Sequence, residues 1–449
     1  MMRGQGLFER AMRGSAVTAL TFLLAQVLRL ASNLILTRLL APEAFGLMAL
    51  VSMVLIGLTL FSDMGIGPSI SQHPRGDDPD FLNTAWTIQI LRGFLLWLAA
   101  TALALPAAWF YGAPQLAVVL PVAAVSLAIG GFVPTRVESA NRHLMLERVM
   151  LLDLAVQAAV LAVMVLLAWW TGSVWALVIG GVLTPVVRIP VMLRYLPGIP
   201  NRLQLERAAA LDLIHFGKWI FLSTVGGFFL LQGDRAILGA HLTLSELGIY
   251  NIGAFLATFP MLLGQAVTGR VLIPLYREAR DPVGGAAVRA RLMRLRYGLT
   301  AVLLALLALL AFGGVLIVRL LYSPSYHEAG AIAVALSCVL MPQAIGLSYD
   351  QAALAAGDSR RFFFVTFARA TMQTGFFLIG VQHWGLAGAL IGQAVAILLA
   401  HPLLAWLAWL NGVWDARHDA VYFALVAVLV VLALTLNRAE VATLAMGHP

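Results

Sequence analysis

The chain has 449 residues, of which 61% are hydrophobic and 11% are charged, and its formal net charge is +8. Soluble domains carry about 25% charged residues, so this composition excludes a water-soluble globule, and it excludes disordered and fibrous chains as well. The single cysteine, Cys338, excludes an intrachain disulfide and a cysteine-rich metal site, and the one lysine, Lys218, precedes Trp219 rather than the Ser or Thr of an ATP-binding loop.

Apolar stretches follow one another from one end of the chain to the other. A membrane span needs about 20 mostly apolar residues. We predict thirteen spans, at residues 15–37, 44–67, 84–105, 115–135, 148–170, 173–193, 212–233, 247–275, 297–321, 328–349, 361–382, 385–410 and 419–436. All are expected to be helices, because a backbone in lipid has to satisfy its own hydrogen bonds. The first is too long for a signal-peptide core, so we expect it to be retained.

The basic residues predict the orientation. With the N terminus in the cytoplasm, most of the 29 Lys and Arg residues fall in cytoplasmic segments, and the outer segments contain only Arg38, Arg235, Arg319 and Arg438. This asymmetry is typical of the positive-inside rule. Anionic lipid headgroups account for the basic charge, so no nucleic-acid partner is predicted. The longest connecting segment, near 276–296, is too short for a catalytic domain, and we do not expect an enzyme.

A weak internal repeat predicts two lobes. Asp153 and Gln157 correspond to Arg369 and Gln373, and both pairs lie 216 positions apart. The predicted divisions are a six-helix lobe at 1–196, a cytoplasmic linker at 197–211, a second six-helix lobe at 212–410, and an extra helix and tail at 411–449. Because six is even, the lobes are parallel repeats, which characteristically enclose a central cavity. The predicted fold class is therefore an all-α membrane protein with two such lobes.

Basic side chains lie well inside four of the predicted spans. They are Arg29, Arg92, Lys218 and Arg369, and each would cost about 2.5–3.5 kcal/mol at mid-span. Arg188 and Arg270 lie nearer to span ends, so we expect them to reach the headgroups at little cost.

Amides accompany these cations on the same helix faces, as helical spacing requires: Gln26 and Asn33 with Arg29, Gln89 with Arg92, and Gln373 with Arg369. One interpretation is a shared, water-filled cationic cavity that binds the substrate. The alternative is that each arginine pairs privately with a neighbouring acid or carbonyl. Since arginine suits phosphate oxygens, the shared cavity predicts a substrate with a phosphate or carboxylate group.

Two acids within spans are candidates for gating or coupling. Asp63 lies at the cytoplasmic end of the second span, where it would cap the helix or relay a proton. Asp153 corresponds to Arg369 in the repeat, so we predict that the two form a salt link across the lobes in one transport state.

The N-terminal stretch resembles a known family. Gly14-Ser15, Arg38-Leu-Leu-Ala-Pro-Glu-Ala-Phe-Gly-Leu47 and Asp63-Met-Gly-Ile-Gly67 resemble the Wzx-type oligosaccharide flippases of the multidrug/oligosaccharidyl-lipid/polysaccharide exporter superfamily. The resemblance implies a V-shaped bundle with alternating access in the bacterial inner membrane. It also implies a cargo, an undecaprenyl-diphosphate-linked oligosaccharide, moved from the cytoplasmic to the periplasmic leaflet for O-antigen, capsule or exopolysaccharide export. Twelve or fourteen helices are usual in this family, so the thirteenth is a departure.

Family membership would also imply membrane lipids and polysaccharide polymerase or export proteins as partners. No cofactor is expected apart from a coupling ion, H⁺ or Na⁺. Two rival functions share the architecture: a flippase for a lipid II-type peptidoglycan precursor, and a multidrug/cation antiporter. An intramembrane glycan polymerase or ligase is a third class, but it would need a sizeable outer loop with catalytic residues.

Overall fold

A computed structural model describes residues 2–143, 145–279 and 285–444, and the regular elements in these ranges are helices. The chain divides into two compact units, Met1–Val225 and Gly226–Pro449, which are treated separately below. The predicted linker at 197–211 lies entirely within the first unit. The division falls instead inside the long helix α9, Arg207–Leu238.

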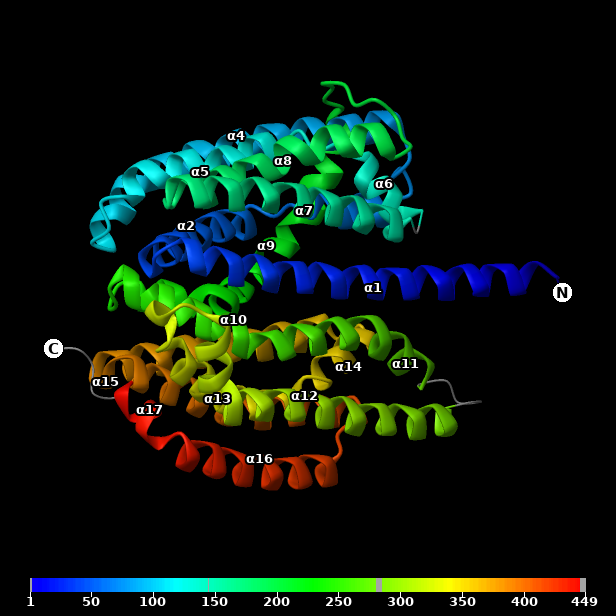
Figure 1. Ribbon diagram of the computed structural model, residues 1–449. Helices are drawn as coiled ribbons and strands as arrows, with labels where there is room; N and C mark the ends of the chain where they lie inside the picture. Colours follow the sequence, from blue (N-terminus) through cyan, green and yellow to red (C-terminus); the bar gives the residue numbers. More distant parts are fainter. Residues whose placement is uncertain (1, 144, 280–284, 445–449) are drawn as a thin grey trace. The chain divides into compact units, whose positions relative to one another are not determined.

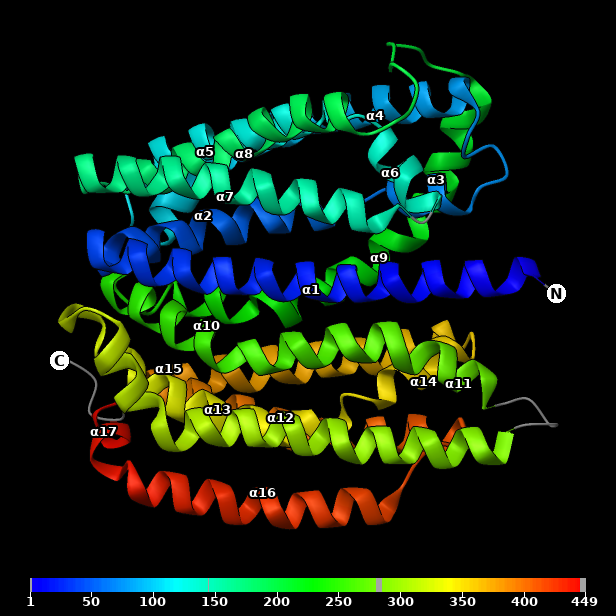
Figure 2. The ribbon, with the colours of Figure 1, turned by 45° about the vertical axis from the view of Figure 1, so that its right-hand side comes forward.

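Unit 1 is a bundle of long helices with short elements at one end. Its helices are α1 (Met2–Leu39), α2 (Pro42–Phe61), α3 (Ile66–Gln72), α4 (Pro79–Phe110), α5 (Leu116–Gly130), α6 (Arg136–Arg142), α7 (Leu146–Thr171), α8 (Trp175–Tyr195) and the first part of α9. Helix α5 packs against α4 and α8, and α7 packs against α8 and α1 (Figures 1 and 2). Helices α1, α7 and α8 thus lie close enough to share a pocket.

Unit 2 is built around one buried helix, α13. Its elements are the rest of α9, α10 (Leu244–Val267), the π-helix η1 (Thr268–Leu272), α11 (Ile273–Glu278), α12 (Gly285–Leu321), the 3₁₀ helix η2 (Pro324–Tyr326), α13 (Ala329–Gly346), α14 (Tyr349–Ala355), α15 (Ser359–Leu410), α16 (Ala416–Leu436) and α17 (Arg438–Thr443). Helix α13 packs against α10, α12, α15 and α16. Every residue of α13 except Gln343 is buried, so this amide is the helix's one half-exposed position.

Helix α15 is in fact two antiparallel helices joined by a sharp turn. Trp384 and Gly385 leave helical geometry, and Gly385 takes a left-handed φ of 56°, which glycine tolerates. The two arms touch through glycines: a Cβ added to Gly388 would lie 2.1 Å from the carbonyl oxygen of Gly380. A Cβ added to Gly392 would likewise lie 2.1 Å from the oxygen of Phe376. Small residues therefore allow this close backbone approach, as in other membrane helix pairs.

Each of the thirteen predicted spans coincides with a helix, α15 providing two. By length and apolar composition, ten of the described helices are candidate spans, with α15 counted once and α5 shorter. The second predicted span was too long, because α2 ends at Phe61 and a turn at Asp63–Gly65 separates it from α3. The predicted fold class, an all-α membrane protein, is confirmed.

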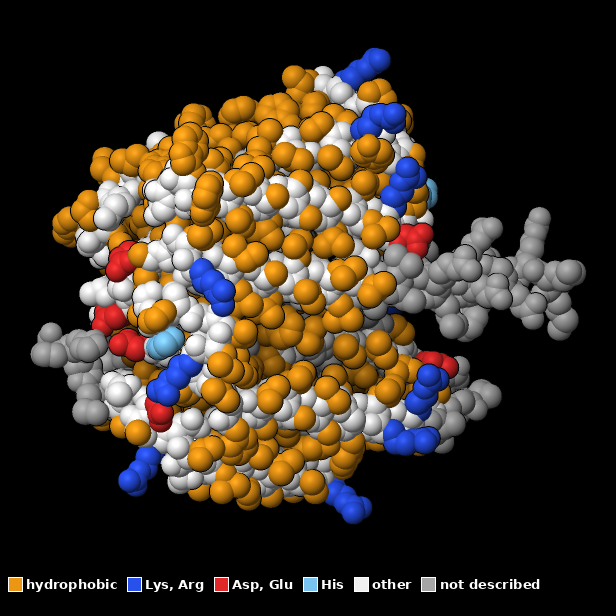
Figure 3. Space-filling model, in the orientation of Figure 1, with side chains coloured by type: hydrophobic (Ala, Val, Ile, Leu, Met, Phe, Trp, Pro, Cys, Tyr) orange, Lys and Arg blue, Asp and Glu red, His pale blue; other side chains and the backbone are white. Residues whose placement is uncertain are grey.

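Apolar side chains cover the outside of the helices. On the face shown in Figure 3, hydrophobic side chains cover the long sides of the bundles, whereas charged ones lie mostly towards the helix ends. Trp109 near the end of α4 and Trp170 near the end of α7 are 87% and 82% exposed. Large exposed apolar groups of this kind fit lipid and its interface, not water.

Candidate functional site

Unit 1 contains a polar pocket between α1, α7 and α8. The cavity is about 540 Å³, within the range of small-molecule sites. Its polar lining consists of Ser32 on α1, Asp153 and Gln157 on α7, and Thr184 and Arg188 on α8. Apolar residues of α7 complete the wall. A pocket with this lining offers a carboxylate, a guanidinium, an amide and two hydroxyls to a polar ligand.

An ion pair closes one side of this pocket. Arg188 donates from Nε to Oδ1 of Asp153 at 2.7 Å and from Nη2 to Oδ2 at 3.1 Å. The side chains retain 30% and 40% of their exposure, so both charges reach the cavity while neutralising each other. The carboxylate on the facing helix offers Arg188 two charge-assisted hydrogen bonds, and the expectation that this side chain reaches the headgroups stays a prediction.

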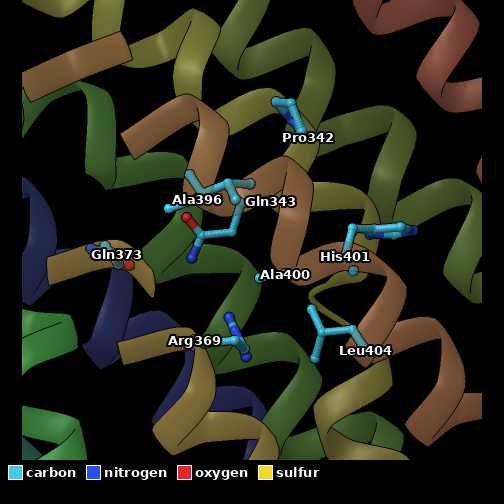
Figure 4. Close-up of a pocket in the computed structure, with 10 residues that line it drawn as sticks. Pro342, Gln343, Arg369, Gln373, Ala396, Ala400, His401 and Leu404 are labelled. Atoms are coloured by element: carbon cyan, nitrogen blue, oxygen red, sulfur yellow. The ribbon is translucent and has the colours of Figure 1, made fainter. Parts of the chain in front are cut away.

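Unit 2 contains a smaller pocket between α13 and the two arms of α15. The cavity is about 20 Å³, which is room for about one water molecule. Its polar lining is Gln343 on α13, Arg369 and Gln373 on the first arm of α15, and His401 on the second (Figure 4). Arg369 also holds Asp350 of α14, with Nη1 at 3.1 and 2.9 Å from the two carboxylate oxygens.

The two pockets use corresponding positions of the repeat. Asp153 and Gln157 line the pocket of unit 1, and their predicted counterparts Arg369 and Gln373 line that of unit 2. The same offset relates Thr184 and Arg188 to Ala400 and Leu404, which line the second pocket. Apolar side chains at those two positions give the unit 2 pocket a less polar wall than its counterpart.

Arg92 and Gln89 of α4 satisfy the ends of neighbouring helices. Arg92 donates from Nε to the hydroxyl of Ser62 at 2.9 Å and from Nη2 to the carbonyl of Thr59 at 2.7 Å, at the C-terminal end of α2. Gln89 donates from Nε2 to backbone carbonyls that follow α5, at Gly131 (3.2 Å) and Val133 (3.1 Å). Carbonyls at a helix C terminus lack partners within the helix. For Arg92 and Gln89 the structure therefore contains the contacts of the alternative interpretation, in which a polar side chain within a span bonds to a neighbouring carbonyl.

Asp63 makes a local contact within its own turn. Its Oδ1 accepts a hydrogen bond from the backbone N–H of Gly65 at 2.9 Å, and Gly65 has a left-handed φ of 60°. The carboxylate thus stabilises the break between α2 and α3. Its predicted role in gating or coupling stays a prediction.

The residues predicted on α1, Gln26, Arg29 and Asn33, do not line the unit 1 pocket, although Ser32 of the same helix does. Arg29 is exposed and Asn33 is half-buried, whereas Oε1 of Gln26 is buried with no hydrogen-bond partner among the residues that the structure describes. The side chains of Lys218 and Arg270 lie outside the described part. The shared cationic cavity stays a prediction.

The predicted salt link between Asp153 and Arg369 is not the pairing that these residues have here. Asp153 pairs with Arg188 inside unit 1, and Arg369 pairs with Asp350 inside unit 2. A link between the lobes would require both pairs to exchange partners, and it stays a prediction.

An ionic cluster joins the segment 196–206 to the end of unit 1. Arg75 binds Glu206 with a shortest distance of 2.6 Å, and Arg142 donates from Nε to Asp77 at 2.9 Å. These groups lie outside the spans. Although desolvation opposes the shift, hydrogen bonds from His143 and Arg142 lower the pKa of Asp77 below its usual value. The segment that precedes α9 is therefore held against the rest of unit 1 by the Arg75–Glu206 ion pair.

Comparisons with known proteins identify relatives of this chain. Residues 35–331 match the family described as polysaccharide biosynthesis proteins. The succinoglycan biosynthesis transport protein ExoT of Rhizobium meliloti is 26% identical over 278 residues, which is 60% of this chain and 54% of that protein. The amylovoran biosynthesis protein AmsL of Erwinia amylovora is 23% identical over 260 residues, 56% of this chain and 64% of that protein. The matched stretches thus span between about half and two thirds of these relatives.

Solved structures share the fold. The lipid II flippase MurJ, in an inward closed conformation, superposes with a TM-score of 0.67 at 12% identity, covering 96% of this chain and 98% of that one. An inward-facing multidrug resistance MATE family transporter superposes with a TM-score of 0.63 at 17% identity, covering 86% and 95%. The predicted polysaccharide family is confirmed by the match over residues 35–331, and the two solved structures, a flippase and a transporter, share the all-helical fold.

Proposed function

Because the chain belongs to the family of polysaccharide biosynthesis proteins, we propose that it flips a prenyl-diphosphate-linked oligosaccharide across the bacterial inner membrane. The cargo moves from the cytoplasmic to the periplasmic leaflet by alternating access of the two lobes. The prenyl chain stays in lipid throughout. Homology to a succinoglycan transport protein and the fold of a lipid II flippase support this proposal.

The unit 1 pocket is the observation that carries the proposal. Its charges cancel in the Asp153–Arg188 pair, so it suits a neutral ligand with many hydroxyls better than a free anion. A carboxylate and an amide accept and donate the hydrogen bonds that sugar hydroxyls make. We therefore assign this pocket to sugar units of the glycan. The diphosphate binds the predicted cations instead, of which Arg29 is exposed on α1.

The same pair counts against a cation antiporter. A cation site in a membrane needs a carboxylate that is available to the cation, but Asp153 already accepts two hydrogen bonds from Arg188. A flippase for a lipid II-type precursor remains the second candidate, because the solved structure of MurJ superposes over almost the whole chain. The two functions differ in the lipid that accumulates when transport stops.

The test is a deletion strain complemented with pocket variants. Deletion should cause one prenyl-linked oligosaccharide to accumulate in the cytoplasmic leaflet, and wild-type protein should clear it. Gln157→Leu and Thr184→Val each remove hydrogen bonding without changing charge, and together they should slow export about 5- to 100-fold, since each hydrogen bond contributes about 0.5–1.5 kcal/mol.

The matched control is Leu166→Ala, which changes an exposed side chain of α7 outside the pocket and should export normally. Accumulation of the peptidoglycan precursor alone would favour the second candidate. Normal clearance by the double variant would contradict the assignment of the pocket to sugar.

A further inference from the structure

A buried carboxylate in unit 2 is surrounded by hydrogen-bond donors from three helices. Asp419, near the start of α16, accepts from Tyr349 of α14, from Nε1 of Trp414 at 3.1 Å, and from rings of His401 at 3.1 Å and His418 at 3.1 Å. An ionised carboxylate has about four acceptor sites and no proton to donate. The Tyr349 hydroxyl and Nε1 of Trp414 donate to Asp419, and the two imidazole rings occupy its remaining acceptor sites, which is the arrangement that fits an ionised carboxylate.

The ionised carboxylate determines the tautomers of both histidines. Because Asp419 accepts only, Nε2 of His401 and Nδ1 of His418 must carry the protons. The other nitrogen of His418, Nε2, lies 3.1 Å from the hydroxyl of Thr300, which donates to it. His418 is fully buried, both of its ring nitrogens have hydrogen-bond partners, and it lines neither of the two pockets.

His401 is different, because it lines the small pocket. Nδ1 makes no hydrogen bond to any residue in the described ranges, and it lies 3.4 Å from the position of a Cβ added to Gly346, another pocket residue. His401 itself lines the pocket with Arg369, Gln343 and Gln373 (Figure 4). Nδ1 is therefore the one basic nitrogen of this network with access to a space the size of a water molecule.

A second observation indicates that polar partners are missing along the same helix face. Thr366 lies three positions before Arg369 and seven before Gln373 on α15, and its Oγ1 is buried with no hydrogen-bond partner among the described residues. Polar cavities of this size commonly hold a water with two to four partners. Water in this pocket would connect Nδ1 of His401 to the polar face of α15.

The surrounding charges balance only while His401 is neutral. Arg296 of α12 is fully buried and places its guanidinium 4.6 Å from the centre of the Tyr349 ring, and Nη1 donates to the carbonyl of Val413 at 2.7 Å. Tyr297 of α12 also packs edge-on against His418. The positive Arg296 offsets the negative Asp419, and Arg369 is offset by Asp350. Asp415, which accepts from the hydroxyl of Tyr297 at 3.3 Å, is offset by the charge of Arg417. One added proton would therefore leave one uncompensated positive charge.

We propose that His401 is a proton-binding residue, held in position by Asp419 and accessible from the pocket that Arg369 lines. Protonation at Nδ1 converts the neutral network into one with a net positive charge beside the Arg369 guanidinium. Like charges repel in a medium of low dielectric, so a proton on His401 favours positions of the Arg369 guanidinium farther from this pocket. The residue thus couples proton occupancy of unit 2 to the position of a charge predicted to bind substrate.

The cluster is not a metal site. Among the residues that the structure describes, no group of three or more His, Cys, Asp or Glu side chains could hold a metal ion. The oxygens of Asp419 accept hydrogen bonds from Tyr349 and Trp414 as well as contacting the two histidines. The ligand that fits an open imidazole nitrogen beside one water is a proton.

Nitrogen NMR of ¹⁵N-histidine-labelled protein in lipid nanodiscs tests the proposal without substrate. The signal lost in His401→Gln identifies the residue. His383→Gln is the matched control, since His383 lies at the end of the first arm of α15, is exposed, and bonds only to Ile379 of that arm. In the wild type, the His401 signal should change from a bare Nδ1 to a doubly protonated ring as the pH is lowered across the range in which the nanodiscs are stable. In Asp419→Asn, which removes the acceptor-only carboxylate, the neutral ring should become a mixture of tautomers.

A His401 ring that keeps one protonation state across that range would overturn the proposal, and so would a neutral ring protonated at Nδ1. The coupling arm rests on the proposed function: collapsing the pH gradient should slow export by the wild type at least about fivefold and leave His401→Gln unaffected. Equal sensitivity of both proteins would overturn the coupling. A wild-type protein that exports nothing would refute the proposed function and leave the NMR result standing.

Discussion

Neutralising Asp350 tests how strongly its ion pair stabilises unit 2. In Asp350→Asn the guanidinium of Arg369 keeps its charge but loses a carboxylate whose oxygens lie at 3.1 and 2.9 Å. Removing one partner of a buried ion pair costs about 3–5 kcal/mol. The two side chains retain 16% and 21% of their exposure, and asparagine keeps one acceptor, so we expect a smaller loss of about 2–3 kcal/mol.

This loss should be visible as a lower melting temperature. For a unit of about 150–250 residues, 1 kcal/mol shifts Tm by about 2–4 °C, so the expected fall is about 4–12 °C. The chain supplies its own probe, because its only cysteine, Cys338, is buried in α13 of unit 2. Reaction of this thiol with a fluorogenic maleimide during heating reports when unit 2 opens.

The charge-swapped variant is the control for this experiment. Asp350→Arg combined with Arg369→Asp restores opposite charges and should recover most of the lost melting temperature. A single variant that melts within about 1 °C of the wild type would mean that the pair contributes less than about 0.5 kcal/mol, which would refute the reasoning from its geometry.

Three further perturbations have defined outcomes. Because the pKa of Asp77 is lowered in the folded protein, its contribution to stability is present above the unfolded-state pKa of about 3.9 and is lost as the pH falls through the folded-state pKa. Limited proteolysis of the 70–80 segment should therefore become faster in acid, and Asp77→Asn should be equally susceptible at neutral pH. Gly388→Leu should abolish the folded monomer in size-exclusion chromatography, because its Cβ would lie 2.1 Å from the oxygen of Gly380, whereas Gly375→Leu, with no atom within 4 Å of its Cβ, should not; a monodisperse Gly388→Leu would contradict the close approach. Gln89→Leu removes the donor shared by the carbonyls of Gly130, Gly131 and Val133 and should cost about 1–3 kcal/mol of stability, and an unchanged melting temperature would show that water replaces the amide.

The helices could be predicted from the sequence because lipid imposes one requirement on every span. About 20 apolar residues have to form a helix wherever they cross, and each predicted span coincides with one. Helix ends were less predictable. The end of α2 at Phe61 depends on a turn in which Asp63 bonds the N–H of Gly65, a local polar contact that apolar periodicity does not report.

The candidate sites were predictable only where partners repeat along the chain. The offset of 216 led to Asp153 and Arg369, and both line pockets. Their partners, Arg188 and Asp350, lie 35 positions after and 19 positions before them on other helices, and no spacing rule connects such residues. The network around Asp419 was missed for the same reason, since His401 and Tyr349 come from different helices.

The arginines and amides within spans were also harder to interpret than to find. Helical spacing placed Arg92 and Gln89 on one face of α4, and both side chains donate to carbonyls at the ends of α2 and α5. Sequence periodicity predicts which side chains share a helix face, but it does not predict which backbone groups of neighbouring helices those side chains contact. The shared cationic cavity therefore stays a prediction that needs its own measurement.

Reconstituted flipping is the measurement that tests the central claim most directly. Purified protein is placed in liposomes together with the prenyl-diphosphate oligosaccharide extracted from the deletion strain, and a membrane-impermeant glycosidase reports the fraction of lipid whose sugar lies in the outer leaflet. Wild-type protein should let the enzyme reach lipid that started in the inner leaflet, and the Gln157→Leu, Thr184→Val variant should do so about 5- to 100-fold more slowly. Access no faster than in protein-free liposomes would contradict the proposed flippase activity.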